Sequence, residues 1–137
     1  MKNLSILFLS ALALSLGSCG SDDNGNPVHT DADIVGKWTY SKVGMGNTLI
    51  DYPDHEDGCN KDYVELTANG VFRDVDYDSF STPCQVFTDE GTYLKDGNTL
   101  TVTYDGDDID VVNILILSET ELKIQNSDGE VVVFTRQ

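Results

Sequence analysis

The sequence predicts an all-β fold: an eight-stranded antiparallel meander closed into a small barrel, preceded by one short helical turn. Short segments in which apolar and polar residues alternate, the pattern of half-buried strands, recur from residue 37 to residue 136. Asn69-Gly70 and Asp96-Gly97-Asn98 separate such segments and indicate hairpins, because both central positions of a type I′ turn need positive φ. No helical periodicity follows the first turn, so a parallel sheet would lack its crossover helices. Such a meander hides its edges most simply by closing.

The chain enters the predicted barrel through a short turn and a first strand. Residues Asp31–Gly36 are compatible with one helical turn that begins at an aspartate N-cap and stops at a glycine. Residues 37–43 alternate, with Trp38 and Tyr40 on one face, and are predicted to form the first strand. Residues 44–60 contain three glycines and a proline, and are predicted to form a long loop.

Three strands are predicted in the middle of the chain: residues 62–68, 71–78 and 86–95. In the second, Phe72 shares its parity with three aspartates, whereas Val75 and Tyr77 have the other parity. A β-bulge after Phe72 would turn Phe72, Val75 and Tyr77 inward and leave the aspartates in water, and we expect this bulge. In the third, Gly91 suggests a bend or a close backbone approach.

Four further strands are predicted in the C-terminal part: residues 99–104, 109–117, 121–126 and 130–136. Residues 109–117 are almost continuously apolar, which favours a central strand with both faces partly covered. Alternation along all the strands places a set of aromatic and aliphatic side chains inside the barrel. They are Trp38, Tyr40, Phe72, Phe87, Tyr93, Leu100, Val102, Tyr104, Leu122 and Ile124.

Residues 1–18 are predicted to be a signal peptide. A positively charged start precedes an apolar run, residues 4–16, that is too short to span a bilayer as a stable helix. The run ends in Leu16-Gly17-Ser18-Cys19, which resembles the lipobox of bacterial lipoproteins, in which the cysteine is lipidated and becomes the new N-terminus. Residues 19–33 would then be a flexible tether. The alternative is an ordinary cleavage site, with Cys19 left as a free thiol.

The residues behind Cys19 and the overall charge bear on the location of the protein. Asp22-Asp23 is similar to the export signal that places lipoproteins of Bacteroidetes-type bacteria on the outer face of the outer membrane; a solvated spacer is the alternative. We therefore expect a lipid anchor in the bacterial outer membrane, on its periplasmic or its surface-exposed face. The net charge is −16, and loss of Lys2 with the signal peptide makes it −17. Such a surface repels nucleic acid, which is not expected as a partner.

Cys59 and Cys84 remain once Cys19 is lipidated. Exported proteins mature in an oxidising compartment, so the default is one disulfide between these two cysteines. The alternative is a metal site that uses His55 and Cys59. The sequence offers no second close pair of ligands for it, and zinc takes four.

A series of landmarks within residues 34–137 carries a family resemblance. They are Gly36-Lys37-Trp38, Cys59, Asp62, Leu66, Asn69-Gly70-Val71-Phe72, Cys84, Gly91-Thr92-Tyr93 and Gly97-Asn98-Thr99-Leu100-Thr101. This pattern resembles the lipocalin-like domain found in lipoproteins of Bacteroidetes. The resemblance implies a calycin-type, lipocalin-like β-barrel over residues 34–137. Its motifs are structural landmarks and imply little about chemistry.

An eight-stranded barrel has an interior that side chains fill or that holds one small ligand. The short strands favour a filled core, and a pocket open at one end is the alternative. The candidates for contact with a ligand are the aromatic side chains Trp38, Tyr40, Phe72, Tyr93 and Tyr104. We predict a membrane-anchored binding module for a small apolar molecule. The alternative is a cell-envelope interaction or structural lipoprotein with a filled core, whose acidic loops contact a protein partner.

No catalytic residue, resident metal or cofactor is predicted. The sequence contains no nucleophile elbow, phosphate-binding loop or zinc-helix motif, so we do not expect an enzyme. A group of four aspartates near residue 106 could share a calcium ion, although a solvated turn explains them better. They are Asp105, Asp107, Asp108 and Asp110.

Overall fold

The structure, a computed structural model, describes residues 28–29 and 33–137 of the chain. All regular elements in this part are strands, and it contains no helix that could cross a membrane. The strands are β1 (Val28–His29), β2 (Gly36–Met45), β3 (Thr48–Asp51), β4 (Tyr63–Leu66), β5 (Val71–Asp78), β6 (Gln85–Asp96), β7 (Thr99–Tyr104), β8 (Ile109–Leu117), β9 (Glu121–Gln125) and β10 (Glu130–Arg136).

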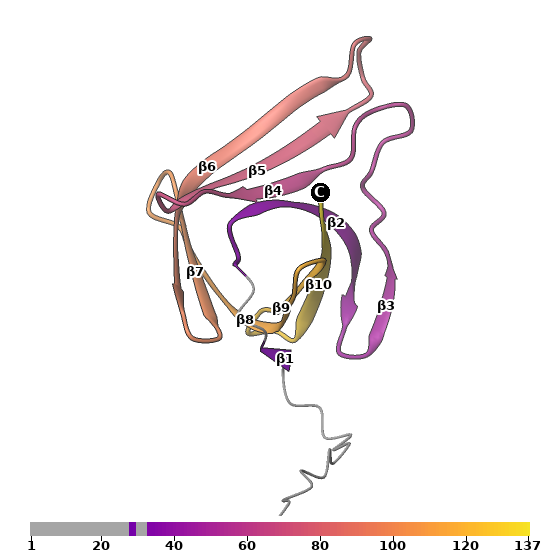
Figure 1. Ribbon diagram of the computed structural model, residues 1–137. Coiled ribbons are helices and arrows are strands. Elements are labelled where there is room, and N and C mark those ends of the chain that lie inside the picture. Colours follow the sequence, from indigo (N-terminus) through magenta and orange to yellow (C-terminus); the bar gives the residue numbers. More distant parts are fainter. Residues whose placement is uncertain (1–27, 30–32) are drawn as a thin grey trace, which may run out of the picture.

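Eight of these strands form a closed antiparallel barrel (Figure 1). Hydrogen-bonded neighbours follow the order β8-β7-β6-β5-β4-β2-β10-β9, and β9 pairs with β8 to complete the ring. Two strands lie outside the ring: β1 pairs in parallel with β8, and β3 pairs with β2. The predicted all-β barrel of eight strands is therefore confirmed, with two additional short strands.

Antiparallel pairing places the connections alternately at the two ends of the barrel. The β4–β5 and β6–β7 turns lie at one end, together with the start of β2 and the end of β10; we call this the closed end. The β5–β6 connection, the β7–β8 turn and the β9–β10 turn lie at the opposite end, which we call the open end.

Trp38 anchors the closed end. Its side chain is 0% exposed, and its Nε1–H donates to the carbonyl oxygen of Ile34, which is itself buried (2.8 Å). The Arg136 guanidinium lies over the Trp38 ring, 4.1 Å from its centroid, and donates to the carbonyl oxygens of Val35 and Asp33. These contacts join the first and last strands of the barrel and cover the interior at this end.

Both predicted hairpins are present, although neither contains a type I′ turn. In the β4–β5 turn, Gly70 has a φ of +82° but Asn69 does not have positive φ, and the N–H of Gly70 donates to the carbonyl oxygen of Thr67 (3.1 Å). This is a type I turn followed by a left-handed glycine. In the β6–β7 turn, Gly97 alone has positive φ (+54°), as in a type II′ turn. Glycine therefore supplies the backbone conformation that closes each hairpin.

The segment before β2 differs from the prediction. Part of the expected helical turn Asp31–Gly36 lies outside the described residues, while residues 33–35 have no regular structure and Gly36 begins β2. The Asp33 carboxylate accepts the N–H of Val35 (2.9 Å), a local turn that competes with helix. The predicted signal peptide and Cys19 also lie outside the described residues. Within the predicted tether, Val28–His29 forms β1.

The predicted loop 44–60 contains a strand, which corrects that prediction. Met45 pairs with Thr48, and Gly46 (φ +57°) stands in the turn between β2 and β3. Gly44 permits the close pairing, because a Cβ at this position would overlap the Thr48 carbonyl oxygen. β3 has only 4 residues and is mostly exposed, so no apolar alternation in the sequence indicates it.

The expected β-bulge after Phe72 is absent, and this prediction was wrong. β5 pairs with β4 and with β6 without any register shift. Side chains therefore alternate strictly: Phe72 and Asp74 line the interior, and Val75 is buried from the opposite face. The close backbone approach expected at Gly91 is confirmed, since a Cβ there would overlap the carbonyl oxygen of Thr103 on β7.

Candidate binding site in the barrel

The barrel interior is filled toward the closed end and hollow toward the open end. Buried apolar side chains pack around Trp38: Ile34, Leu66, Phe72, Leu100, Leu117, Leu122 and Phe134. Beside this core lies a cavity of about 140 Å³. It is lined by Tyr40, Val64, Leu66, Phe72, Asp74, Leu100, Val102, Tyr104, Asp110, Val112, Leu122, Ile124, Val132 and Phe134. Two tyrosines and two aspartates thus stand in an otherwise apolar lining.

Asp74 and Tyr40 form the most buried polar pair of this lining. The Tyr40 hydroxyl lies 3.0 Å from both carboxylate oxygens of Asp74 and donates to them. Burial raises the pKa of Asp74 to about 6, and the like charges of Asp76, Asp89 and Asp62 act in the same direction, whereas the Tyr40 hydrogen bond opposes the shift. Burial and the adjacent Asp74 carboxylate likewise raise the pKa of Tyr40.

The segment between β3 and β4 covers Tyr40 from the open end. The Tyr52 ring stacks on the Tyr40 ring at 4.6 Å and meets the His55 ring edge-on at 4.9 Å. His55 Nδ1 accepts the N–H of Asp62 (3.2 Å), so its Nε2–H donates to the Tyr40 carbonyl oxygen (2.8 Å). The buried Asp62 carboxylate accepts the N–H of Tyr77 on β5 (2.8 Å). These bonds fix the segment against the mouth of the cavity.

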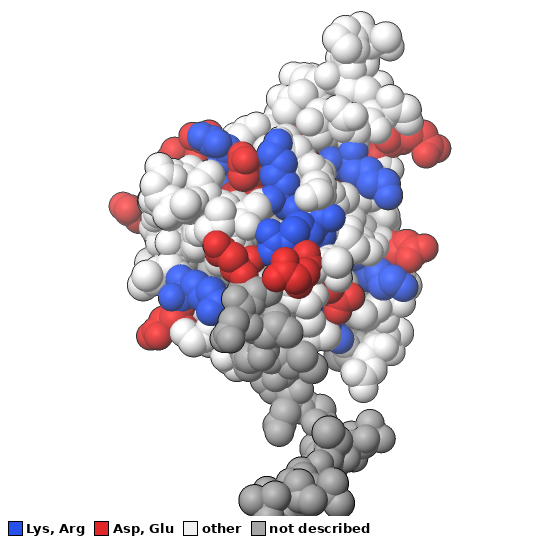
Figure 2. Space-filling model, in the orientation of Figure 1, with Lys and Arg blue, Asp and Glu red and all other residues white. Residues whose placement is uncertain are grey.

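Carboxylates that have no ion-pair partner gather near the cavity. Burial raises the pKa of Asp76, and Asp62, Asp89 and Asp54 add to the shift through their charge. On the face drawn in Figure 2 the charges are mixed, and Lys and Arg lie beside Asp and Glu. The ion pairs of the described residues are Lys42–Asp51, Arg73–Glu65 and Arg73–Glu90. The His55 ring lies 3.5 Å from the Asp62 carboxylate, but the nitrogen nearest to it, Nδ1, is the one that accepts the Asp62 N–H.

Two surface grooves share lining residues with the cavity. β8 pairs with β9 only from Asn113 onward, which leaves a groove of about 440 Å³ in the barrel wall. A wider groove of about 850 Å³ lies between β6 and the β7–β8 turn and includes Tyr104 of the cavity lining. Asp110, an exposed residue, lines the cavity and both grooves. Burial, followed by the charge of Asp110, raises the pKa of Tyr104 to about 12.

The five predicted ligand-contact residues occupy different places. Tyr40, Phe72 and Tyr104 line the cavity, and the Phe72 and Tyr104 rings meet edge-to-face at 5.5 Å. Trp38 belongs to the core at the closed end, and Tyr93 donates its hydroxyl proton to the Thr67 carbonyl oxygen (2.7 Å) outside the cavity lining.

One of the other predicted interior residues remains accessible to solvent. Phe87 is 49% exposed, because β5 beyond Val75 pairs only with β6 and the hairpin extends past the barrel. Asp74 was not among the predicted site residues, and Asp110 was considered only as a calcium ligand. In the sequence Asp74 has the same parity as Phe72, which places both side chains on one face of the strand. The bulge that we expected after Phe72 would have turned Asp74 to the other face.

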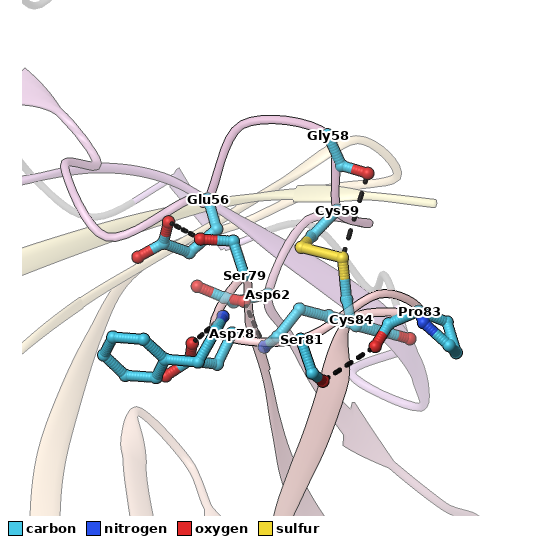
Figure 3. The surroundings of a disulfide bond; sticks show 11 residues. Glu56, Gly58, Cys59, Asp62, Asp78, Ser79, Ser81, Pro83 and Cys84 are labelled. Atoms are coloured by element: carbon cyan, nitrogen blue, oxygen red, sulfur yellow. Dashed lines mark hydrogen bonds between the residues drawn. A yellow bond between two sulfur atoms is a disulfide. The ribbon is translucent and has the colours of Figure 1, made fainter.

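The predicted disulfide between Cys59 and Cys84 is confirmed, with an S–S distance of 2.03 Å. It joins the segment between β3 and β4 to the β5–β6 connection (Figure 3). A second contact joins the same two segments, since the Ser79 hydroxyl donates to the Glu56 carboxylate (2.7 Å). The disulfide therefore holds the covering segment to the extended hairpin at the open end.

Three of the four aspartates considered for calcium, Asp105, Asp107 and Asp108, lie in the β7–β8 turn, and Asp110 lies at the start of β8. The N–H of Tyr104 donates to the Asp108 carbonyl oxygen (2.9 Å), and Asp107 has a left-handed backbone (φ +69°). In residues 28–29 and 33–137, no group of three or more His, Cys, Asp or Glu side chains could hold a metal ion. Cys59, the proposed partner of His55 in the zinc alternative, is in the disulfide.

Comparisons with known proteins agree with this architecture. A lipocalin-like protein from Bacteroides uniformis is 13% identical and superposes with a TM-score of 0.60, over 75% of this chain and 97% of that chain. An uncharacterized protein from Bacteroides eggerthii is 11% identical with a TM-score of 0.60, over 77% of this chain and 100% of its own. No curated protein matches the sequence. The sequence pattern of the lipocalin-like domain matches residues 22–124, and the chain therefore belongs to the lipocalin-like domain family.

Proposed function

We propose that this protein is a lipid-anchored binding module for a small, largely apolar molecule. The observation that carries the proposal is the apolar cavity of about 140 Å³ inside a lipocalin-like barrel. An apolar cavity of about 150 Å³ accommodates a molecule the size of benzene, whereas pockets for larger ligands start at about 300 Å³. The barrel therefore receives one ring or a short chain, and any larger part of the ligand extends into the two grooves.

Ethylbenzene is a suitable neutral probe for this cavity, and we expect Val112→Phe to abolish its binding. Val112 lines the cavity, so the larger ring occupies the space of the probe. The matched control is Val86→Phe: Val86 lies on β6, is 51% exposed and lines neither the cavity nor the two grooves. Titration calorimetry or probe-observed NMR measures the affinity. If ethylbenzene binds neither the wild type nor the control, or binds all three proteins equally, the proposed function is wrong.

Membrane attachment through Cys19 is the second part of the proposal, and it is supported by the lipobox-like Leu16-Gly17-Ser18-Cys19. We expect Cys19→Ser to move the protein from the membrane fraction to the soluble fraction and to remove the acyl mass from its N-terminal peptide. Ser18→Ala is the control, because it keeps a small residue before the cysteine. Mass spectrometry of the wild-type N-terminal peptide without an added lipid would contradict the anchor.

A further inference from the structure

We propose that the molecule held by the barrel carries a cationic amine, which Asp74 and Asp110 bind while its apolar part fills the cavity. This inference rests on the proposed function, because it names the chemical class of the ligand of the same cavity. It comes from two carboxylates in an otherwise apolar lining that has no matching positive charge.

Asp74 lacks the partner that a carboxylate in an apolar cavity needs. Among the described residues, its side chain accepts hydrogen bonds from the Tyr40 hydroxyl alone. None of the ion pairs in this part of the chain includes Asp74 or Asp110. Three further carboxylates act on Asp74 with the same sign of charge: Asp76, Asp89 and Asp62. An ammonium group at this place would supply the missing positive charge and additional hydrogen-bond donors.

The surroundings suit an organic cation better than a metal ion. A calcium site needs six to eight oxygen ligands around one point, and no convergent set of acidic, His or Cys side chains exists among the described residues. The carboxylates of Asp74 and Asp110 instead share a cavity with the rings of Tyr40 and Tyr104. Aromatic faces attract ammonium groups, and the apolar lining takes the hydrocarbon that an amine carries.

The position of Asp110 determines how such a molecule would lie. Asp110 is exposed and stands where the cavity meets both grooves, so a ligand can reach it from solvent. An amine near Asp110 and Asp74 leaves the ring of its ligand among the apolar residues of the cavity. The groove beside β8 provides room for a longer substituent, along Val112, Ile124 and Val132.

Three probes with the same ring separate charge from shape: 2-phenylethylamine, ethylbenzene and 3-phenylpropionate. We expect calorimetry on the purified protein to give the amine an affinity at least about tenfold higher than that of ethylbenzene, and the anion the lowest affinity. The advantage of the amine should shrink when NaCl rises from about 0.02 to about 0.5 M, since salt screens the charges, while ethylbenzene should be unaffected.

Asp74→Asn and Asp110→Asn should each lower the affinity for the amine about tenfold and leave that for ethylbenzene unchanged. The matched control is Asp107→Asn. Asp107 lies in the β7–β8 turn, three residues before Asp110, and its replacement removes the same charge. Its side chain lines neither the cavity nor the two grooves, and asparagine tolerates its positive φ. Thermal unfolding verifies that each variant is folded.

The outcomes distinguish this inference from the proposed function. An amine that binds no more tightly than ethylbenzene overturns the amine site and leaves the apolar binding module intact. An equal loss of amine affinity in Asp107→Asn and in Asp74→Asn would assign the effect to the general acidity of the protein, and also overturns the site. If ethylbenzene does not bind, the proposed function fails, and the inference fails with it when the amine does not bind either.

Discussion

Replacement of both Cys59 and Cys84 by serine is expected to lower the free energy of unfolding by about 3.5 kcal/mol. The two cysteines are 25 residues apart in the sequence. A cross-link over a loop of this length lowers the conformational entropy of the unfolded chain, which stabilises the folded state by about 3.5 kcal/mol. Urea denaturation monitored by circular dichroism measures the difference between the double variant and the wild type. The wild type in the presence of reductant should show the same loss.

Ser79→Ala is the control for this experiment. It removes the hydrogen bond to Glu56, which joins the same two segments as the disulfide, and should cost no more than about 1 kcal/mol. A double cysteine variant that is as stable as the wild type would show that the cross-link contributes nothing to the stability of the barrel.

The substitution Asp74→Asn is expected to stabilise the protein by about 2 kcal/mol at pH 7.5. The pKa of Asp74 in the folded protein is about 6, against 3.8 without the protein environment. A carboxyl group whose pKa is raised on folding binds its proton more tightly in the folded state, so stability falls as the pH rises from about 4 to about 6. The full pKa shift corresponds to about 3 kcal/mol of lost stability above pH 6, and the partial exposure of Asp74 reduces this loss to about 2 kcal/mol.

The predicted gain therefore depends on pH, which makes it easy to test. Below about pH 3 the carboxyl is protonated in the folded and unfolded states, and the difference in melting temperature between Asp74→Asn and the wild type should vanish. The asparagine oxygen can still accept the Tyr40 hydrogen bond, so the packing is retained. Asp107→Asn, on an exposed turn, should change the melting temperature little at either pH. A gain of equal size at both pH values would contradict this account of Asp74.

The two experiments on Asp74 support one interpretation when read together. Replacement of a group with a purely structural role would lower the stability of the protein. The Asp74 carboxylate is instead expected to reduce stability at neutral pH while it increases the affinity for an amine. Groups that destabilise the empty protein and bind a ligand are typical of functional sites. The variant that is more stable at pH 7.5 should therefore be the weaker amine binder.

The sequence by itself determined the strand pattern, the hairpins and the disulfide. Each follows from local chemistry: alternation marks strands such as β7, and glycine provides the positive φ at Gly70 and Gly97. The expected export of the chain predicted the disulfide between Cys59 and Cys84, which the structure contains. The closure of the barrel also followed, because a meander of eight strands leaves two edges that must be hidden.

Only the tertiary structure decided what faces the interior at the open end. Alternation shows that Phe72 and Asp74 share a face, but whether a bulge separates them depends on the register of β5 with β4 on one side and with β6 on the other. The preference for burying Val75 suggested the bulge, and the continuous ladder overrode it. The cavity also depends on the tertiary structure, because the space left between side chains depends on how seven strands meet, and neighbouring residues on one strand do not reveal it.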